Sequence, residues 1–129
     1  MPMQPSSVPS TTPSTAPLLV ACLCAQWCTT CREHEAVFLA VQLQFFDEAR
    51  FVRVDIEDEA ELLDGVEIEN FPTLLIARGD AVLFFGTITP HAQTLARLVA
   101  GARSGDLKPL PAHAPIDSLV RRLRGFANA

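Results

Sequence analysis

Two cysteines separated by two residues are the part of this chain best suited to chemistry. The segment Trp27-Cys28-Thr29-Thr30-Cys31 lets one helical turn hold both sulfur atoms, so a small, reversible disulfide ring can close between them. A thiolate attacks a disulfide, and a second thiol nearby then resolves the mixed disulfide that forms. The spacing therefore predicts thiol–disulfide exchange, with Cys28 attacking and Cys31 resolving.

The residues on either side of the motif predict the elements that position it. Residues 18–25 are an apolar run after Pro17 and predict a buried strand, whereas residues 32–48 lack proline and glycine and carry apolar side chains at helical spacing. Cys28 would then lie at a strand-to-helix junction, where unpaired N–H groups and the helix dipole stabilise a thiolate. Cys31 would lie one turn inside the helix.

The same cysteines are compatible with a zinc site or with an inert pair. Cys22 and Cys24 precede the motif, so that four thiols fall within ten residues. Residues 22 and 24 share one face of the predicted strand, and a buried strand has little freedom to wrap a tetrahedral ion. We therefore expect redox chemistry and no metal site, with metal binding kept as an alternative.

The rest of the chain predicts a small α/β fold. Further strands are expected at residues 51–56, 73–77 and 81–86, and helices at residues 59–63 and from Pro90 to near Gly101. The first strand, the first helix and the second strand make a right-handed crossover, which sets the two strands parallel. The last two strands form a hairpin that turns at residues 78–80.

Together these motifs resemble the thioredoxin superfamily. The resemblance spans residues 18–101 and rests on four elements: Trp27-Cys28-x-x-Cys31, the strand 51–56, Phe71-Pro72-Thr73 about forty residues after the motif, and Gly86 in the last strand. It implies a thioredoxin-like three-layer α/β/α fold. Its central four-stranded mixed sheet would have the order 51–56, 18–25, 73–77, 81–86.

The resemblance also implies a set of site residues. Pro72 would be a cis-proline that faces a redox-active Cys28–Cys31 disulfide, and the backbone around Phe71 would hold an extended substrate segment. The supporting residues implied around them are Trp27, Thr29, Thr30 and Thr73. No cofactor beyond the disulfide is expected. The implied partners are protein disulfides and a reductase that recycles the dithiol.

Several positions depart from the family pattern. We expect the usual first strand and helix to be absent, because only the proline-rich segment stands before residue 18, and Thr29-Thr30 stands where thioredoxins usually carry Gly-Pro. Cys22 occupies the position of the family's buried aspartate, Cys24 an aromatic position and Arg53 that of a lysine. The usual proton acceptor for Cys31 is thus absent. Either Cys22 replaces it as a thiolate favoured by Arg53, or water accepts the proton and resolution is slow.

The three histidines are predicted to take no part in this chemistry. His34 lies one turn beyond Cys31, and we expect it on the exposed side of the helix, because its spacing directs it away from Cys28. His91 lies at a helix start and His113 in a proline-rich linker, and neither has a candidate partner nearby in the sequence.

The two ends of the chain differ from its body in composition. Residues 1–17 hold five of the ten prolines and no charged side chain, which predicts a disordered lead-in to the domain at residues 18–102. Residues 103–115 predict a linker, and residues 116–126 an amphipathic helix. Residues 103–129 carry a net charge of +3, against −8 for residues 1–102. We expect the helix to dock on its own domain, with a partner or a membrane surface as alternatives.

Composition limits the classes of function. A chain of 129 residues with a net charge of −5 and eight acids between Asp55 and Glu69 disfavours nucleic acid as a partner. No run approaches the roughly 20 apolar residues of a membrane span, and no secretory signal is recognised, so the cytoplasm is the expected location. The predicted function is a protein thiol–disulfide oxidoreductase. The alternatives are a thioredoxin-like interaction or chaperone module and a thiolate metal-binding protein.

Overall fold

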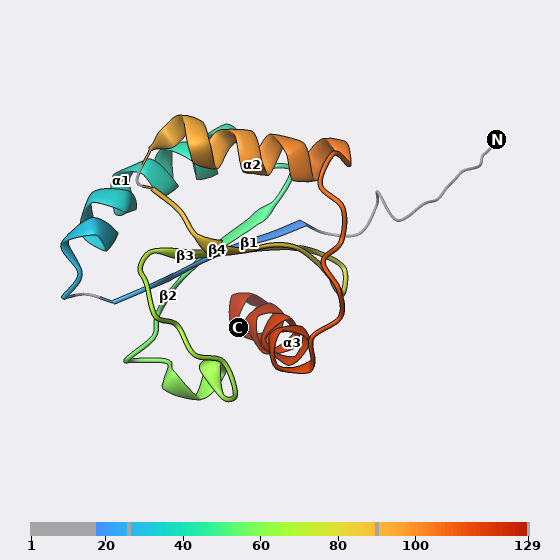
Figure 1. Ribbon diagram of the computed structural model, residues 1–129. Helices are drawn as coiled ribbons and strands as arrows, with labels where there is room; N and C mark the ends of the chain where they lie inside the picture. The colour runs from blue at the N-terminus through green and yellow to red at the C-terminus, as the bar shows by residue number, and fades with distance from the viewer. Residues whose placement is uncertain (1–17, 26, 90, 129) are drawn as a thin grey trace.

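A four-stranded mixed sheet forms the middle layer of the molecule (Figure 1). The computed structural model describes residues 18–25, 27–89 and 91–128, so the predicted lead-in at residues 1–17 and the predicted helix start at Pro90 lie outside them. The strands are β1 (Leu18–Cys24), β2 (Arg50–Asp55), β3 (Thr73–Arg78) and β4 (Ala81–Thr87), in the order β2-β1-β3-β4. The predicted fold class and strand order are confirmed.

Strand β1 lies in the centre because every one of its residues is apolar and buried. It pairs in parallel with β2, which places Cys22 opposite Arg53, and antiparallel with β3. Strands β3 and β4 form the predicted hairpin, in which Gly79 has a positive φ of 59°. The carboxyl end of the buried central strand therefore carries Cys22 and Cys24 toward the Cys28 loop.

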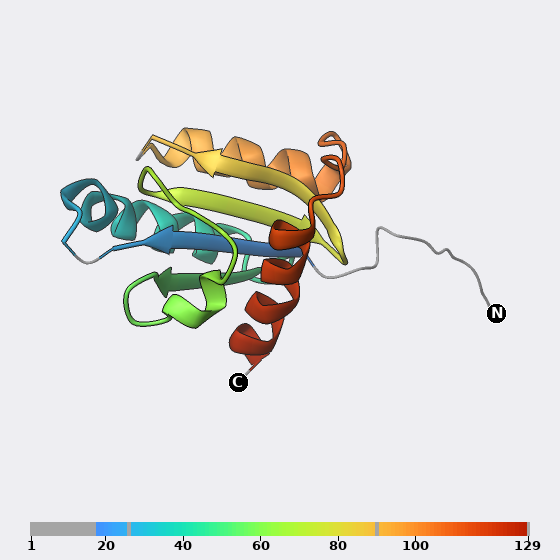
Figure 2. The same ribbon diagram turned by 60° about the horizontal axis from the view of Figure 1, so that its bottom comes forward.

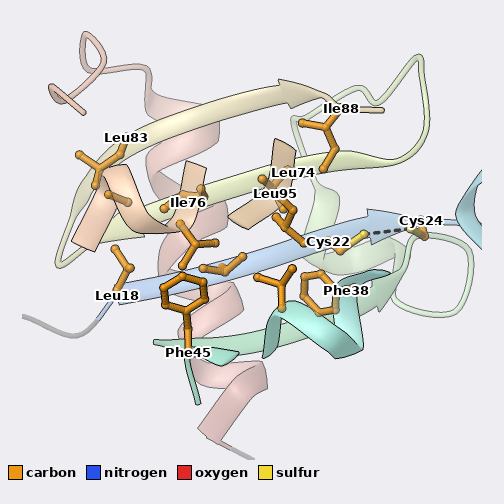
Figure 3. Close-up of a cluster of buried hydrophobic side chains, with 14 of the residues drawn as sticks. Leu18, Cys22, Cys24, Phe38, Phe45, Leu74, Ile76, Leu83, Ile88 and Leu95 are labelled. Atoms are coloured by element: carbon orange, nitrogen blue, oxygen red, sulfur yellow. Dashed lines mark hydrogen bonds between the residues drawn. The ribbon is translucent and has the colours of Figure 1, made fainter. Parts of the chain in front are cut away.

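Helices α1 (Thr29–Gln44) and α2 (Ala92–Ser104) cover one face of the sheet (Figure 1). Phe38 and Val41 of α1 and Leu95 of α2 are buried against β1 and β3 in one hydrophobic cluster, part of which Figure 3 shows. Helix α2 does not end near Gly101 as predicted. It continues to Ser104, and Gly105, with a φ of 87°, ends it in a left-handed conformation.

The opposite face of the sheet is covered by α3 (Ala114–Asn128) and a short 3-10 helix, η2 (Ala60–Leu63). Figure 2 shows α3 crossing the sheet. Leu119, Val120 and Leu123 are buried in a second hydrophobic cluster with side chains of β1 and β3. The Arg122 guanidinium donates hydrogen bonds to the Leu62 and Asp64 carbonyls, both at 2.9 Å. The C-terminal helix thus packs on its own domain.

Helix α3 begins at Ala114, two residues before the predicted start at 116, because His113 and Asp117 form its first turn. The His113 N–H donates to a carboxylate oxygen of Asp117 at 3.2 Å, and the Asp117 N–H donates to the His113 carbonyl at 2.9 Å. No helix in the described part of the chain combines the length and the apolar character needed to cross a membrane.

Candidate active site

Cys28 and Cys31 lie where β1 passes into α1. The Cys28 N–H donates to the Ala25 carbonyl at 3.0 Å, and the Cys28 carbonyl accepts a hydrogen bond from the Arg32 N–H at 3.2 Å. Cys28 is the N-cap residue of α1, with extended backbone angles (φ −83°, ψ 118°). Its side chain is half-buried, whereas Cys31, one turn inside the helix, is only 1% exposed. An accessible thiol and a sheltered thiol thus share one helical turn, and both are free.

The sheltered position of Cys31 changes its acidity. Burial raises the pKa of the Cys31 thiol to about 12, with the backbone of Ala25 acting in the opposite direction and the thiols of Cys24 and Cys28 adding to the rise. At neutral pH the Cys31 sulfur therefore keeps its proton. A proton acceptor has to reach Cys31 before it can attack.

The loop between η2 and β3 lies beside the active-site turn. The Trp27 and Phe71 rings meet edge to face, with centroids 5.6 Å apart and planes at 85°. The Phe71–Pro72 peptide bond is cis, and the buried Thr73 hydroxyl donates to the Asn70 carbonyl at 2.6 Å. Two segments far apart in the sequence thus meet beside Cys28. Trp27 is 61% exposed, so the aromatic pair faces solvent.

The other residues that the sequence motifs single out lie in α1 and in β4. Thr29 is exposed and Thr30 half-buried in the first turn of α1. Gly86 of β4 lies opposite Leu74 of β3. A Cβ at position 86 would lie 3.6 Å from the Phe84 ring, an ordinary van der Waals distance, so the packing there does not require glycine.

Cys22 and Cys24 form a second pair of thiols beneath the active-site turn. Their Sγ atoms are 3.1 Å apart, as the dashed line in Figure 3 marks, and the residues are 0% and 4% exposed. Contact with Cys22 and burial raise the pKa of the Cys24 thiol well above its ordinary value, and interactions with Cys31 and Arg53 only partly oppose this rise. The Cys24 thiol therefore lies between Cys22 and Cys31 and is protonated at neutral pH.

His34 is buried, so the prediction that it lines the exposed side of α1 is wrong. It is 0% exposed, and its Nδ1 lies 3.5 Å from the Cys22 Sγ. The reason is helical spacing, because position 34 falls on the sheet-facing side with the buried Cys31, Phe38 and Val41. The sequence shows that His34 shares a helix face with Cys31, Phe38 and Val41, but it does not show that this face is turned to the sheet.

The buried imidazole of His34 is neutral at physiological pH. Burial lowers its pKa to about 4, and the positive charge of Arg53 acts in the same direction. Among the described residues, no group hydrogen-bonds its Nε2. His34 therefore offers Cys22 a neutral ring nitrogen in a dry environment.

Arg53 supplies the positive charge next to these thiols. Its guanidinium forms an ion pair with Glu35 at 2.9 Å. Burial alone would lower the pKa of Arg53, but its interactions with Cys24 and Glu35 raise it overall. The positive charge of Arg53 thus favours the thiolate form of Cys24 most directly.

A pocket of about 470 Å³ opens beside this cluster. Its lining includes the thiols of Cys24 and Cys31 and the charged groups of Glu35, Arg53 and Asp55. Water that enters the pocket can therefore reach the sheltered side of Cys31. Within the described ranges, no group of three or more histidine, cysteine or acidic side chains is arranged to hold a metal ion.

Comparisons with known proteins agree with this geometry. The thioredoxin family model matches residues 10–100. Thioredoxin H2-1 of Oryza sativa subsp. japonica is 38% identical over 55 residues, which are 43% of this chain and 39% of the rice protein. The chain thus aligns with about two fifths of the length of that curated relative.

Solved structures of thioredoxins share the fold. The thioredoxin of Trypanosoma brucei brucei superposes with a TM-score of 0.60 at 24% identity, over 70% of this chain and 79% of that one. The germline-specific thioredoxin Deadhead of Drosophila melanogaster gives a TM-score of 0.60 at 21% identity, over 67% and 82% of the two chains. At these identities the likeness shows a thioredoxin-like fold.

Proposed function

Because the chain belongs to the thioredoxin family, we propose that it is a thiol–disulfide oxidoreductase that reduces or exchanges disulfides of other proteins. The observation that carries this proposal is the pairing of a half-buried Cys28 at the start of α1 with a buried Cys31 one turn inside the same helix. A redox couple needs this asymmetry, because the first thiol must reach a substrate and the second must remain sheltered until the mixed disulfide forms.

The reaction proceeds in two displacements. The Cys28 thiolate, formed at the N-terminus of α1, attacks one sulfur of a substrate disulfide, and the other substrate sulfur leaves as a thiolate. The Cys31 sulfur then loses its proton and attacks the Cys28 sulfur of the mixed disulfide. The substrate leaves with both sulfurs reduced, and the Cys28–Cys31 disulfide remains.

Substrate binding falls to the surface that Trp27 and Phe71 make beside Cys28. The exposed edge-to-face pair offers apolar contact area on both sides of the turn. An extended substrate segment lies across the residues around Pro72, with Thr73 holding that loop through its hydrogen bond to Asn70. Partners of this kind are proteins with exposed disulfides, and a reductase that restores the dithiol.

The proton of Cys31 leaves through water in the adjacent pocket. Cys22 is less suited to accept it, because the Cys24 thiol lies between Cys22 and Cys31 in the row of contacts. With the pKa of Cys31 near 12, this route makes the second displacement the slow one. A reducing compartment such as the cytoplasm suits a protein that works with its four thiols free.

A reductase assay tests the proposal. In the presence of dithiothreitol, the protein should accelerate the reduction of insulin disulfides, and Cys28→Ser should return the rate to that of dithiothreitol alone. A matched control is Cys22→Ser, which removes a thiol of the same type that substrate cannot reach. An insulin rate that equals the uncatalysed rate with the unaltered protein would reject the proposed activity.

A further inference from the structure

The four thiols form one continuous row from the surface into the core. Cys22, Cys24 and Cys31 share one buried cluster, and Cys28 packs against it. Cys31 and Cys24 line the same pocket, and the Cys24 sulfur lies 3.1 Å from that of Cys22. The row thus runs Cys28, Cys31, Cys24, Cys22, from a half-buried first sulfur to a last one that is 0% exposed. Only Cys28 and Cys31 are used by the reaction proposed above.

We infer that Cys22 and Cys24 are a second redox couple, which takes over the disulfide from Cys28 and Cys31 by internal exchange. The pair then stores a second pair of electrons for protein disulfide substrates. The inference rests on the proposed function and extends it, because the fully reduced chain would deliver four electrons before it needs a reductase instead of two.

The exchange balances without an outside oxidant. The Cys24 sulfur gives up its proton and attacks the Cys31 sulfur of the Cys28–Cys31 disulfide, so that a Cys24–Cys31 bond forms and Cys28 leaves as a thiolate. The Cys22 sulfur then gives up its proton and attacks Cys24, which forms the Cys22–Cys24 bond and releases Cys31. The two thiol protons end on Cys28 and Cys31, and the chain as a whole is neither oxidised nor reduced.

The surroundings of the buried pair support each step. Arg53 lines the same pocket as Cys24, and its positive charge stabilises the thiolate that must attack first. The neutral Nδ1 of His34 lies 3.5 Å from the Cys22 sulfur and holds it in place, while the Cys22 proton passes to the departing Cys31 sulfur. Since the pKa of Cys24 remains raised, the exchange is slower than the first reduction of substrate.

Strand geometry sets the direction in which the stored disulfide reacts. Residues two apart on one strand have Cα atoms about 6.6 Å apart, near the upper end of the range that a disulfide spans. The two sulfurs must also approach by about 1 Å from their present separation to bond. A strained disulfide is more readily reduced, so the buried pair becomes oxidised only while excess substrate keeps the surface pair oxidised. When a reductase recycles the surface pair, the buried disulfide is reduced in turn.

Counting thiols during a reaction with excess substrate tests the inference. The fully reduced chain, freed of reductant under anaerobic conditions, is mixed with excess oxidised insulin, quenched with acid at successive times and alkylated for mass spectrometry. We expect two thiols to disappear quickly and two more slowly, with peptide maps showing a Cys22–Cys24 bond. Cys22→Ala and Cys24→Ala should lose the slow phase and keep the fast one.

Two control variants distinguish internal exchange from a packing effect and from direct oxidation of the buried pair. Val20→Ala shortens a buried side chain on the same face of β1 and should keep both phases. Loss of the slow phase in the cysteine variants alone would then not be a consequence of altered packing. Cys28→Ser should keep its buried thiols reduced, and oxidation of Cys22 and Cys24 in that variant would show that they react directly and would overturn the internal exchange. Loss of only two thiols from the unaltered chain would overturn the inference alone, and loss of none would reject the proposed oxidoreductase as well.

Discussion

The Nδ1 of His34 lies 3.5 Å from the Sγ of Cys22, so an imidazole from α1 is enclosed against the central strand. Such a ring is stable there only while it is neutral, because the described residues give its Nε2 no partner. Burial accordingly lowers the pKa of His34 from 6.5 to about 4.

This burial predicts a loss of stability in mild acid. The unfolded chain binds a proton on His34 below about pH 6.5, whereas the folded chain binds it only near pH 4. The free energy of unfolding should therefore be at its full value above pH 6.5 and fall by about 3 kcal/mol as the pH drops to 4. Urea unfolding of the unaltered chain and of His34→Leu across pH 4–7.5 measures the difference. Parallel curves would contradict the assigned pKa.

A second prediction concerns the aromatic pair Trp27 and Phe71. Phe71→Ala removes the ring that Trp27 contacts and should raise the KM for a protein disulfide several-fold, with little effect on a small aryl disulfide that touches only Cys28. Phe46→Ala is the matched control, because that ring is 69% exposed and takes no part in the site. Equal KM values for the protein substrate in both variants would exclude this surface as the binding site.

A third prediction concerns the slow loss of the thiol proton of Cys31, which precedes the second displacement. Below its pKa of about 12, the thiolate fraction of Cys31 grows tenfold per pH unit, so resolution of a preformed mixed disulfide should accelerate steadily from pH 6 to 9. Cys24→Asp puts a carboxylate into the pocket that Cys31 also lines and should increase the rate between about pH 6 and 8. Stopped-flow release of a fluorescent peptide measures both. An unchanged rate in Cys24→Asp would mean that the chain does not lack an efficient proton acceptor.

A fourth prediction tests the role of α3 as a cover for the sheet. Leu119 and Leu123 are both 0% exposed, so each change to alanine should cost about 2–5 kcal/mol of unfolding free energy. Arg121→Ala, on the exposed side of the same helix, should change stability by no more than about 0.5 kcal/mol. Removal of residues 104–129 should lower the melting temperature and increase binding of a hydrophobic dye. Unaltered stability in the leucine variants would contradict the packing.

The sequence predicts the sheet and the Cys28–Cys31 turn because both follow from local signals. The apolar run at residues 18–25 predicts a buried strand, and the chain without proline or glycine that follows the motif predicts α1. The position of His34 depends instead on which side of α1 faces the sheet, which the weak amphipathic pattern of that helix does not fix. Leu39 and Leu43 of α1 are apolar but exposed, so apolar residues occur on more than one side of this helix.

The thiol row also depends on tertiary structure. Alternation along β1 predicts that Cys22 and Cys24 share a face, but the contact between Cys24 and Cys31 requires α1 to pack on that face. Docking of the C-terminal helix on its own domain is the expectation from the sequence, but a partner and a membrane surface stay as alternatives, because an amphipathic helix does not identify the surface that buries it. The choice follows from the three-dimensional arrangement, where α3 buries Leu119 and Leu123 against the sheet face opposite α1.

The central claim is that Cys28 attacks and Cys31 resolves, and covalent trapping tests it most directly. Cys31→Ser and Cys28→Ser variants, each reduced and freed of reductant, are incubated with a disulfide-bonded protein substrate and separated on non-reducing gels. Cys31→Ser should accumulate a stable mixed disulfide through Cys28, confirmed by peptide mapping, whereas Cys28→Ser should form none because its remaining thiols are sheltered. Equal trapping by the two variants would contradict the assignment.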